Sequence, residues 1–280
     1  MSPEPAESTT PKKSGTGLNL AVLLVTSGLI LGAALYWRRG ETKEIAPRPT
    51  VSEKPAAARS QAPFRLTLAD PLLWVKTSEA DFQERSVDFL PVSGSTPPLR
   101  RLRLRAATIG TRDDTVKFLG ARSAEPIPLG KGGKVSVDVD WNHQANGCYL
   151  AAQIVLAPAK TEGNPLGGAD WLKVEYLGVP PGTNGRLAVG TRTSGRDGPL
   201  FTEGWPQVRR EGRPIGLQHV DIEIKDRGFV VRENGVESYV SKPDEAPAMQ
   251  EAYLYLQMST HSNYPARELY FGRVEYVPAD

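Results

Sequence analysis

A series of short runs in which every second residue is apolar fills the chain from about residue 99 to residue 277. In KVSVDVDW, residues 134–141, the valines lie on one side of an extended chain and the polar residues on the other. Turn sequences rich in Gly and Pro separate the runs, and Asn234-Gly235 is a strong hairpin signal. The pattern predicts an all-β domain built as an antiparallel two-sheet sandwich. The predicted strands are residues 100–105, 134–141, 148–158, 171–179, 186–193, 218–226, 227–234, 236–240, 252–259 and 268–277.

The N-terminal part has a different character. Residues 14–39 contain an uncharged stretch, SGTGLNLAVLLVTSGLILGAALYW, between two pairs of cations. At a helical rise of about 1.5 Å per residue, this stretch is long enough to cross a hydrocarbon core of about 30 Å. It predicts one N-terminal transmembrane helix, and a cleaved signal peptide is the alternative. Gly28 and Gly32 are spaced for close helix approach, which leaves a homodimer open.

This segment divides the chain into four predicted parts. A disordered tail covers residues 1–13, the membrane span 14–39, a Pro- and Ala-rich linker 40–63, and the β domain 64–280. A short N-terminal tail followed by a large C-terminal domain is typical of a signal anchor. We therefore expect a single-pass membrane protein with its β domain outside the cytoplasm.

Charge and cysteine content exclude some function classes. The chain has 34 basic and 32 acidic residues, so no dominant positive field favours nucleic acid, and we predict no nucleic-acid partner. Cys148 is the only cysteine, so no disulfide can form within the chain. His143, His219 and His261 lack the close spacing of metal ligands, and no transition-metal site is predicted.

Three stretches resemble the concanavalin A-like lectin and glucanase superfamily, which also contains laminin G-like modules. They are VSVDVDWNHQANGCYLAAQIVL, LQHVDIEIKDRGFVVRENGVE and EAYLYLQMSTHSNYPARELYFGRVEYV. The first two are similar to hairpins of that fold, and the third to its C-terminal strand pair. The resemblance covers about residues 64–278 and implies a jelly-roll sandwich. It does not identify a ligand, because the fold hosts lectins, hydrolases and adhesion modules.

The sharpest catalytic candidate is HVDIEI, residues 219–224. Family-sixteen glycoside hydrolases of the superfamily carry Glu-x-Asp-x-Glu on one strand, and Asp221 and Glu223 match its second and third positions. His219 stands where the resemblance implies the nucleophilic Glu, which removes a residue that a retaining mechanism requires. A polar edge of a half-exposed strand would show the same alternation.

Asp138 and Asp140 form a second carboxylate pair, two residues apart. With Asn142 and His143 they could hold Ca²⁺ or act on a sugar, and either could partner Asp221 and Glu223 in a hydrolase. Two alternate strand carboxylates supply fewer oxygens than the six to eight that Ca²⁺ takes. We therefore predict no cofactor, with Ca²⁺ as the alternative.

Carbohydrate recognition needs planar rings for stacking and amides or charges for hydroxyl groups. The polar sides of the predicted strands and the loop near the C-terminus offer this chemistry. The predicted ligand contacts are Asp138, Asp140, Gln153, Arg192, Tyr255, Gln257, His261 and Asn263. If several of the strands are neighbours, most of these residues would share one sheet surface.

The sequence thus predicts a membrane-anchored module that binds carbohydrate or protein without catalysis. A glycoside hydrolase that uses Asp221 and Glu223 is the first alternative, and a scaffold domain without a ligand is the second.

Overall fold

The computed structural model describes residues 66–79, 82–96, 99–108, 116–141, 150–177, 186–198, 216–225, 227–243, 245–261 and 265–279. These residues form two antiparallel sheets. In this part of the chain no helix is long and apolar enough to cross a membrane. The predicted tail 1–13, span 14–39 with Gly28 and Gly32, and linker 40–63 lie outside the described residues.

The first sheet, sheet A, has the strand order β1-β4-β14-β7-β8-β9-β10, and β5 pairs with β14. Its strands are β1 (Trp74–Ser78), β4 (Lys117–Ser123), β5 (Ile127–Pro128), β7 (Leu150–Ala157), β8 (Trp171–Leu177), β9 (Arg186–Thr193), β10 (Arg196–Asp197) and β14 (Glu251–Thr260). The late strand β14 lies between β4 and β7, so residues far apart in the sequence meet at the middle of the sheet.

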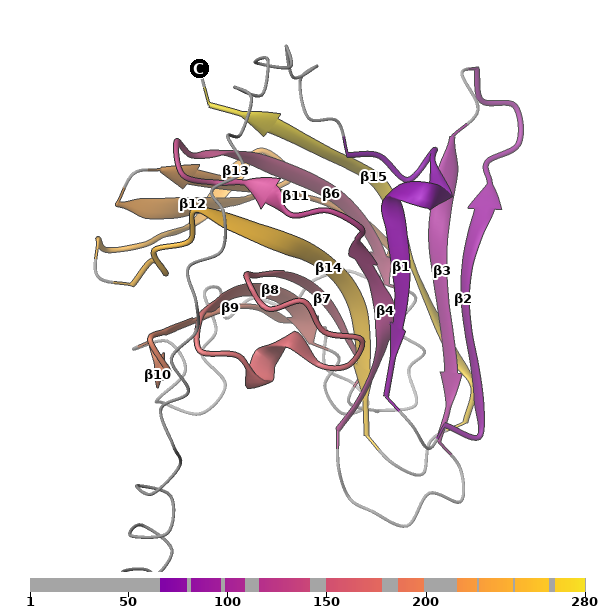
Figure 1. Cartoon of the computed structure of the whole chain (residues 1–280). Helices are drawn as coiled ribbons and strands as arrows, with labels where there is room; N and C mark the ends of the chain where they lie inside the picture. The colour runs from indigo at the N-terminus through magenta and orange to yellow at the C-terminus, as the bar shows by residue number, and fades with distance from the viewer. Residues whose placement is uncertain are drawn as a thin grey trace, which may run out of the picture. The chain divides into compact units, whose positions relative to one another are not determined.

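The second sheet, sheet B, has the order β13-β12-β11-β6-β15-β3-β2. Its strands are β2 (Glu84–Pro91), β3 (Arg100–Ala107), β6 (Gly133–Trp141), β11 (Gly216–Lys225), β12 (Gly228–Glu233), β13 (Val236–Val240) and β15 (Arg267–Pro278). Figure 1 shows β7, β8, β9 and β14 in one bent layer beneath β6, β11, β12 and β15. Two short 3-10 turns, η1 (Pro71–Leu73) and η2 (Pro165–Gly167), are the helical elements of the described residues.

The apolar positions of the predicted alternations form the core between the sheets. Sheet B contributes Val135, Val137, Val139, Val220 and Ile222, and sheet A contributes Ile154, Leu156, Val174, Leu254 and Leu256. All of these side chains are at most 1 % exposed. The two-sheet sandwich predicted from the sequence is therefore confirmed.

The Asn-Gly hairpin is confirmed as well. Asn234 and Gly235 join β12 to β13 with φ values of 52° and 77°. Both values lie in the left-handed region that Asn and Gly tolerate best. The structure adds β1, β2 and β4, which the sequence analysis does not predict. In β4, KFLGARS, a glycine and two cations interrupt the apolar pattern.

Candidate functional site

The structure separates the predicted site residues onto two surfaces. We call the side of sheet A that points away from the core face A, and the corresponding side of sheet B face B. Face A carries Gln153, Arg192, Tyr255 and Gln257, while face B carries Asp138, Asp140, Asp221 and Glu223. The expectation of one shared surface is wrong. Strand alternation tells which residues point away from the core, but it does not tell which sheet a strand joins.

A polar network occupies the middle of face A. The Gln153 amide donates to the Glu175 carboxylate at 2.8 Å and to the Ser259 hydroxyl at 3.3 Å, and its carbonyl accepts from Gln257 at 2.6 Å. The Lys173 ammonium lies 2.7 Å from the other oxygen of Glu175. These five side chains, which we call the face-A network, are each at most 6 % exposed. Buried polar groups of this kind fix one arrangement because each partner satisfies another.

The burial corrects the predicted roles of Gln153, Gln257 and Tyr255. We expected these residues at an exposed surface, but they are 3 %, 1 % and 0 % exposed. The Tyr255 hydroxyl donates to the Ala159 carbonyl at 2.5 Å and accepts from the Thr161 amide at 3.0 Å. Burial raises the pKa of Tyr255, so the hydroxyl stays protonated. Tyr255 therefore fixes the connection between β7 and β8 and offers no free hydroxyl to a ligand.

In the described part of the chain, face A carries two half-buried aromatic rings, Phe118 and Tyr253, and alternation places Tyr253 on the same side as Tyr255. Tyr253 is half-buried and packs against a small apolar cluster that contains Val155 and Trp171. Two cations approach its ring: the Arg122 guanidinium carbon lies 5.2 Å from the ring centroid and the Lys160 ammonium 5.8 Å. The sequence analysis did not propose Arg122 or Lys160, because β4 was not predicted and Lys160 lies in a loop.

Face B carries cross-strand ion pairs. His219 lies between two carboxylates: its Nδ1 is 2.6 Å from Asp138 and its Nε2 is 3.3 Å from Asp221. Ser136 donates a hydrogen bond to Asp221, and Arg232 donates one to Glu223. The hydrogen bond from Arg232 lowers the pKa of Glu223. Burial alone would raise the pKa of Asp221, but Ser136, Lys134 and His219 together lower it. Both carboxylates are therefore ionised at neutral pH and neither is a general acid there.

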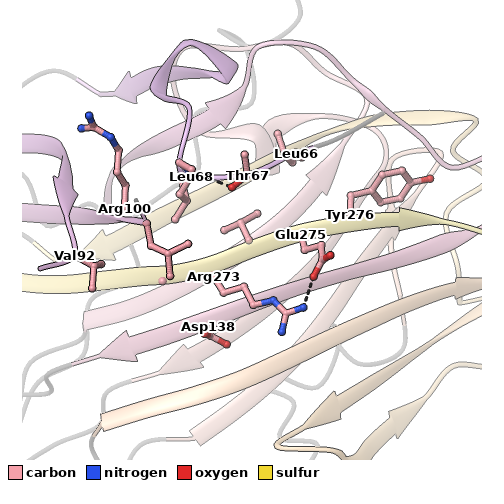
Figure 2. Close-up of a pocket in the computed structure, with 13 residues that line it drawn as sticks. Leu66, Thr67, Leu68, Val92, Arg100, Asp138, Arg273, Glu275 and Tyr276 are labelled. Atoms are coloured by element: carbon pink, nitrogen blue, oxygen red, sulfur yellow. Dashed lines mark hydrogen bonds and ion pairs between the residues drawn. The ribbon is translucent and has the colours of Figure 1, made fainter. Parts of the chain in front are cut away.

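A cavity of about 530 Å³ opens at the edge of face B, between β15, the start of β3 and residues 66–69 (Figure 2). Its apolar lining includes Leu68 and Tyr276, and its charged lining residues are Arg100, Asp138, Arg273 and Glu275. Each of these charges already has a partner. Arg100 donates to the Phe89 carbonyl, Asp138 pairs with His219, and Arg273 pairs with Glu275. The cavity is therefore large enough for a small ligand, but its charged side chains are already paired within the protein.

The remaining predicted residues lie apart from the face-A network. Arg192 forms an ion pair of 2.7 Å with Asp197 near the end of β9. His261 follows β14, and its backbone carbonyl accepts a hydrogen bond from the Thr108 hydroxyl at 2.7 Å. Asn263, Asn142 and His143 are outside the described residues. Within the described ranges, no three His, Cys, Asp or Glu side chains are grouped so that they could hold a metal ion.

The ion pairs of face B predict a loss of stability in acid. Asp88, Asp221 and Glu223 have folded-state pKa values below their ordinary values of 3.8, 3.8 and 4.5. Their stabilisation is complete above those ordinary values and disappears as the pH falls through the lower folded-state pKa values. We expect the urea midpoint, followed by tryptophan fluorescence, to fall between about pH 6 and about pH 3.

The matched control for this acid dependence is the double variant Asp221→Asn, Glu223→Gln, which should show a weaker pH dependence. The raised pKa of Glu79, caused by burial, acts in the opposite direction and limits the effect. A midpoint that stays constant over this pH range would contradict the account of face B.

No protein-family model matches the sequence. No curated protein matches it either. Among solved structures, a native glycosidic hydrolase superposes with a TM-score of 0.51 at 12 % identity over 78 % of this chain and 96 % of its own. A β-1,3-1,4-glucanase (lichenase) derived from a mouse hindgut metagenome gives 0.50 at 12 % identity over 77 % and 99 %. An endo-β-galactosidase from Clostridium perfringens gives 0.50 at 11 % identity over 81 % and 66 %.

The chain also spans 18 % of a longer sialidase, with a TM-score of 0.47. At identities near 12 %, these likenesses describe architecture. The structures with TM-scores of 0.50 and 0.51 support the predicted two-sheet sandwich. The chain is therefore an all-β, two-sheet antiparallel sandwich, and it shares this architecture with the glycosidic hydrolase and the lichenase.

Proposed function

We propose that this chain is a glycan-binding protein and that sugars bind on face A around the Tyr253 ring. The observation that carries the proposal is the composition of face A. This face points away from the core, and it carries a tyrosine ring with two cations beside it. Tyr253 offers part of a fixed ring, and Arg122 and Lys160 offer hydrogen-bond donors beside it. An immobilised ring next to polar donors is the chemistry that recognises sugars.

The face-A network would act as the support of this site. Its buried hydrogen bonds tie β7 to β8 and β14 on the same face, four residues along β14 from Tyr253. Tyr255 holds the connection that carries Lys160 against the same face. A site built on rigid strands keeps its contacts in place before the ligand arrives, which lowers the entropy cost of binding.

Binding is favoured over cleavage by the state of the carboxylates. Glycoside hydrolysis takes one protonated and one ionised carboxyl group on opposite sides of the scissile bond. Within the face-A network, as far as the structure describes it, Glu175 is the one carboxylate, and it is paired with Lys173. Asp221 and Glu223 are both ionised and point away from sheet A.

Glycoside hydrolysis is the second candidate, because the structural neighbours named above are mostly glycoside hydrolases. Those names favour it over a lectin without activity. A hydrolase that used face B would depend on Glu223, and one that used face A would depend on Glu175. The rate at which the protein releases new reducing ends from a glycan would measure this. If the active site is on face B, Glu223→Gln should lower that rate more than about a hundredfold and Glu175→Gln should leave it unchanged; if the site is on face A, the two results are exchanged.

The proposed binding predicts a selective loss in the variant Tyr253→Ala. The full-length chain, in a detergent without sugar headgroups, would be applied to a glycan array. We expect binding to at least one class of glycan, and Tyr253→Ala should weaken it by about fivefold, because stacking contributes about 1 kcal/mol. The matched control is Tyr270→Ala, which removes a half-buried ring from face B.

Two outcomes would contradict the proposal of glycan binding on face A. One is a wild-type chain that binds no glycan while circular dichroism shows it folded, which would favour the scaffold alternative. The other is binding that Tyr270→Ala weakens and Tyr253→Ala does not, which would place the site on face B.

A further inference from the structure

Arg122 is a buried cation without a counter-ion among the described residues. It lies in the middle of β4 and is 5 % exposed. Its Nη1 donates to the Ser123 carbonyl at 2.9 Å, while its Nε has no hydrogen-bond partner. No carboxylate of the described residues lies within 4.0 Å of it. Leaving a buried charge unpaired is costly, so such a group is a candidate for binding an anion.

The surroundings of Arg122 can be compared with those of the other cations on the two sheets. Three sheet cations are paired with carboxylates: Arg103 with Asp88 at 2.8 Å, Arg105 with Glu84 at 2.6 Å, and Lys173 with Glu175 at 2.7 Å. Arg122 has no such partner among the described residues and lies against a tyrosine ring, as Arg101 does on face B. Its neighbour on face A is the ring of Tyr253, which attracts the cation but leaves the Nε proton unbonded.

Lys160 adds a second positive charge at the same ring. It is exposed, its ammonium lies 5.8 Å from the Tyr253 centroid, and no described carboxylate pairs with it. Two positive charges near one ring raise the positive potential around Tyr253, which favours the binding of an anion there. The long, exposed side chain of Lys160 can turn toward such an anion at little cost, whereas Arg122 is fixed by burial.

We propose that face A selects acidic glycans, and that Arg122 and Lys160 bind a carboxylate or sulfate group of a sugar that lies at Tyr253. This inference rests on the proposed glycan binding and specifies the ligand class of that site. The Arg122 guanidinium holds a fixed positive charge beside the ring that attracts the acid group, and Lys160 closes on the group from the solvent side. The carboxylate of a uronic acid and the sulfate of a sulfated sugar share this chemistry.

The test compares matched acidic and neutral ligands on the full-length chain by isothermal titration calorimetry. The probes are hexagalacturonate, its fully methyl-esterified form, and a neutral and a sulfated galactan oligosaccharide of equal length. We expect at least about tenfold tighter binding of one acidic probe than of its neutral counterpart, with the preference falling as salt is raised. A preference for the galacturonate would show that the site binds a sugar carboxylate. A preference for the sulfated galactan would show that it binds a sugar sulfate.

The variant Arg122→Met keeps the volume of the side chain and removes its charge. It should weaken binding of the preferred acidic probe by at least about tenfold more than binding of the neutral one, so that the acidic preference disappears. Lys160→Glu tests the same site from an exposed position, so it also serves if Arg122→Met fails to fold, and it should weaken acidic binding at least as much. Arg103→Met, on face B, is the control and should change neither affinity.

The failure of this inference can be told apart from the failure of the proposed function. Equal affinity for acidic and neutral probes would overturn the acidic selectivity and leave glycan binding intact. The same holds for an acidic preference that survives in both Arg122→Met and Lys160→Glu. Absence of binding to every glycan would instead overturn the proposed function, and this inference with it.

Discussion

Replacing Gln153 by alanine is expected to lower the free energy of unfolding by about 3 kcal/mol, because its amide is the centre of the face-A network. The change removes the donor to Glu175 and the acceptor for Gln257 at once. Both partners stay buried, at 1 % exposed each, so water does not replace the lost hydrogen bonds. Urea unfolding followed by tryptophan fluorescence measures the loss as a lower midpoint at constant slope.

Arg192→Ala provides the matched comparison for Gln153→Ala. Arg192 is also on face A, but its ion pair with Asp197 is exposed to solvent. Exposed pairs contribute about 0 to 1 kcal/mol, so this variant should be nearly as stable as the wild type. Equal stability losses in the two variants would show that the network is not the buried support that the structure describes.

A side chain at Gly120 is expected to destabilise the sandwich by about 3 kcal/mol. Gly120 is in β4 opposite Gln257 in β14. A Cβ at this position would lie 2.7 Å from the Cα of Gln257 and 2.8 Å from its Cβ. Because both contacts are with a neighbouring strand in the middle of sheet A, the backbones of β4 and β14 would have to separate. Thermal unfolding of Gly120→Ala should show a clear decrease in Tm.

Gly167→Ala is the control for the substitution at Gly120. Gly167 lies in η2, where an added Cβ would have no neighbour within 4 Å. Its Tm should stay close to that of the wild type. If Gly120→Ala unfolds at the same temperature as Gly167→Ala, the close approach of β4 and β14 is not part of the stable fold.

The strands with clean alternation could be predicted from the sequence because alternation reports burial on one side. The runs that became β6, β11 and β15 show this pattern clearly, whereas all eight residues of β7 are buried. The edge strand β2 and the short β1 could not be predicted, since charges at Glu84 and Lys76 blur the apolar period. In β4, Gly120 is required by close packing against β14, which a single sequence cannot reveal.

The site was harder to predict than the fold. Alternation placed Tyr253, Tyr255 and Gln257 on one side of β14, and this is confirmed. It could not show that Tyr255 is buried beneath the β7–β8 connection, because that contact joins residues about a hundred positions apart. For the same reason it grouped Asp138 and Asp140, which lie on sheet B, with residues of sheet A. The burial of Tyr255 and the sheet that each strand joins both depend on contacts between distant parts of the chain. The spacing of apolar residues within one strand carries no information about those contacts.

The most direct test of the account is to ask which tyrosine a bound glycan covers. Hydroxyl-radical footprinting of the full-length chain, with and without the oligosaccharide that binds most tightly in the array, compares Tyr253 on face A with Tyr270 on face B. Both rings are half-buried, and each lies near an arginine, Arg122 or Arg101. The account predicts that the glycan slows oxidation of Tyr253 and leaves Tyr270 unchanged. Protection of Tyr270 alone would contradict it.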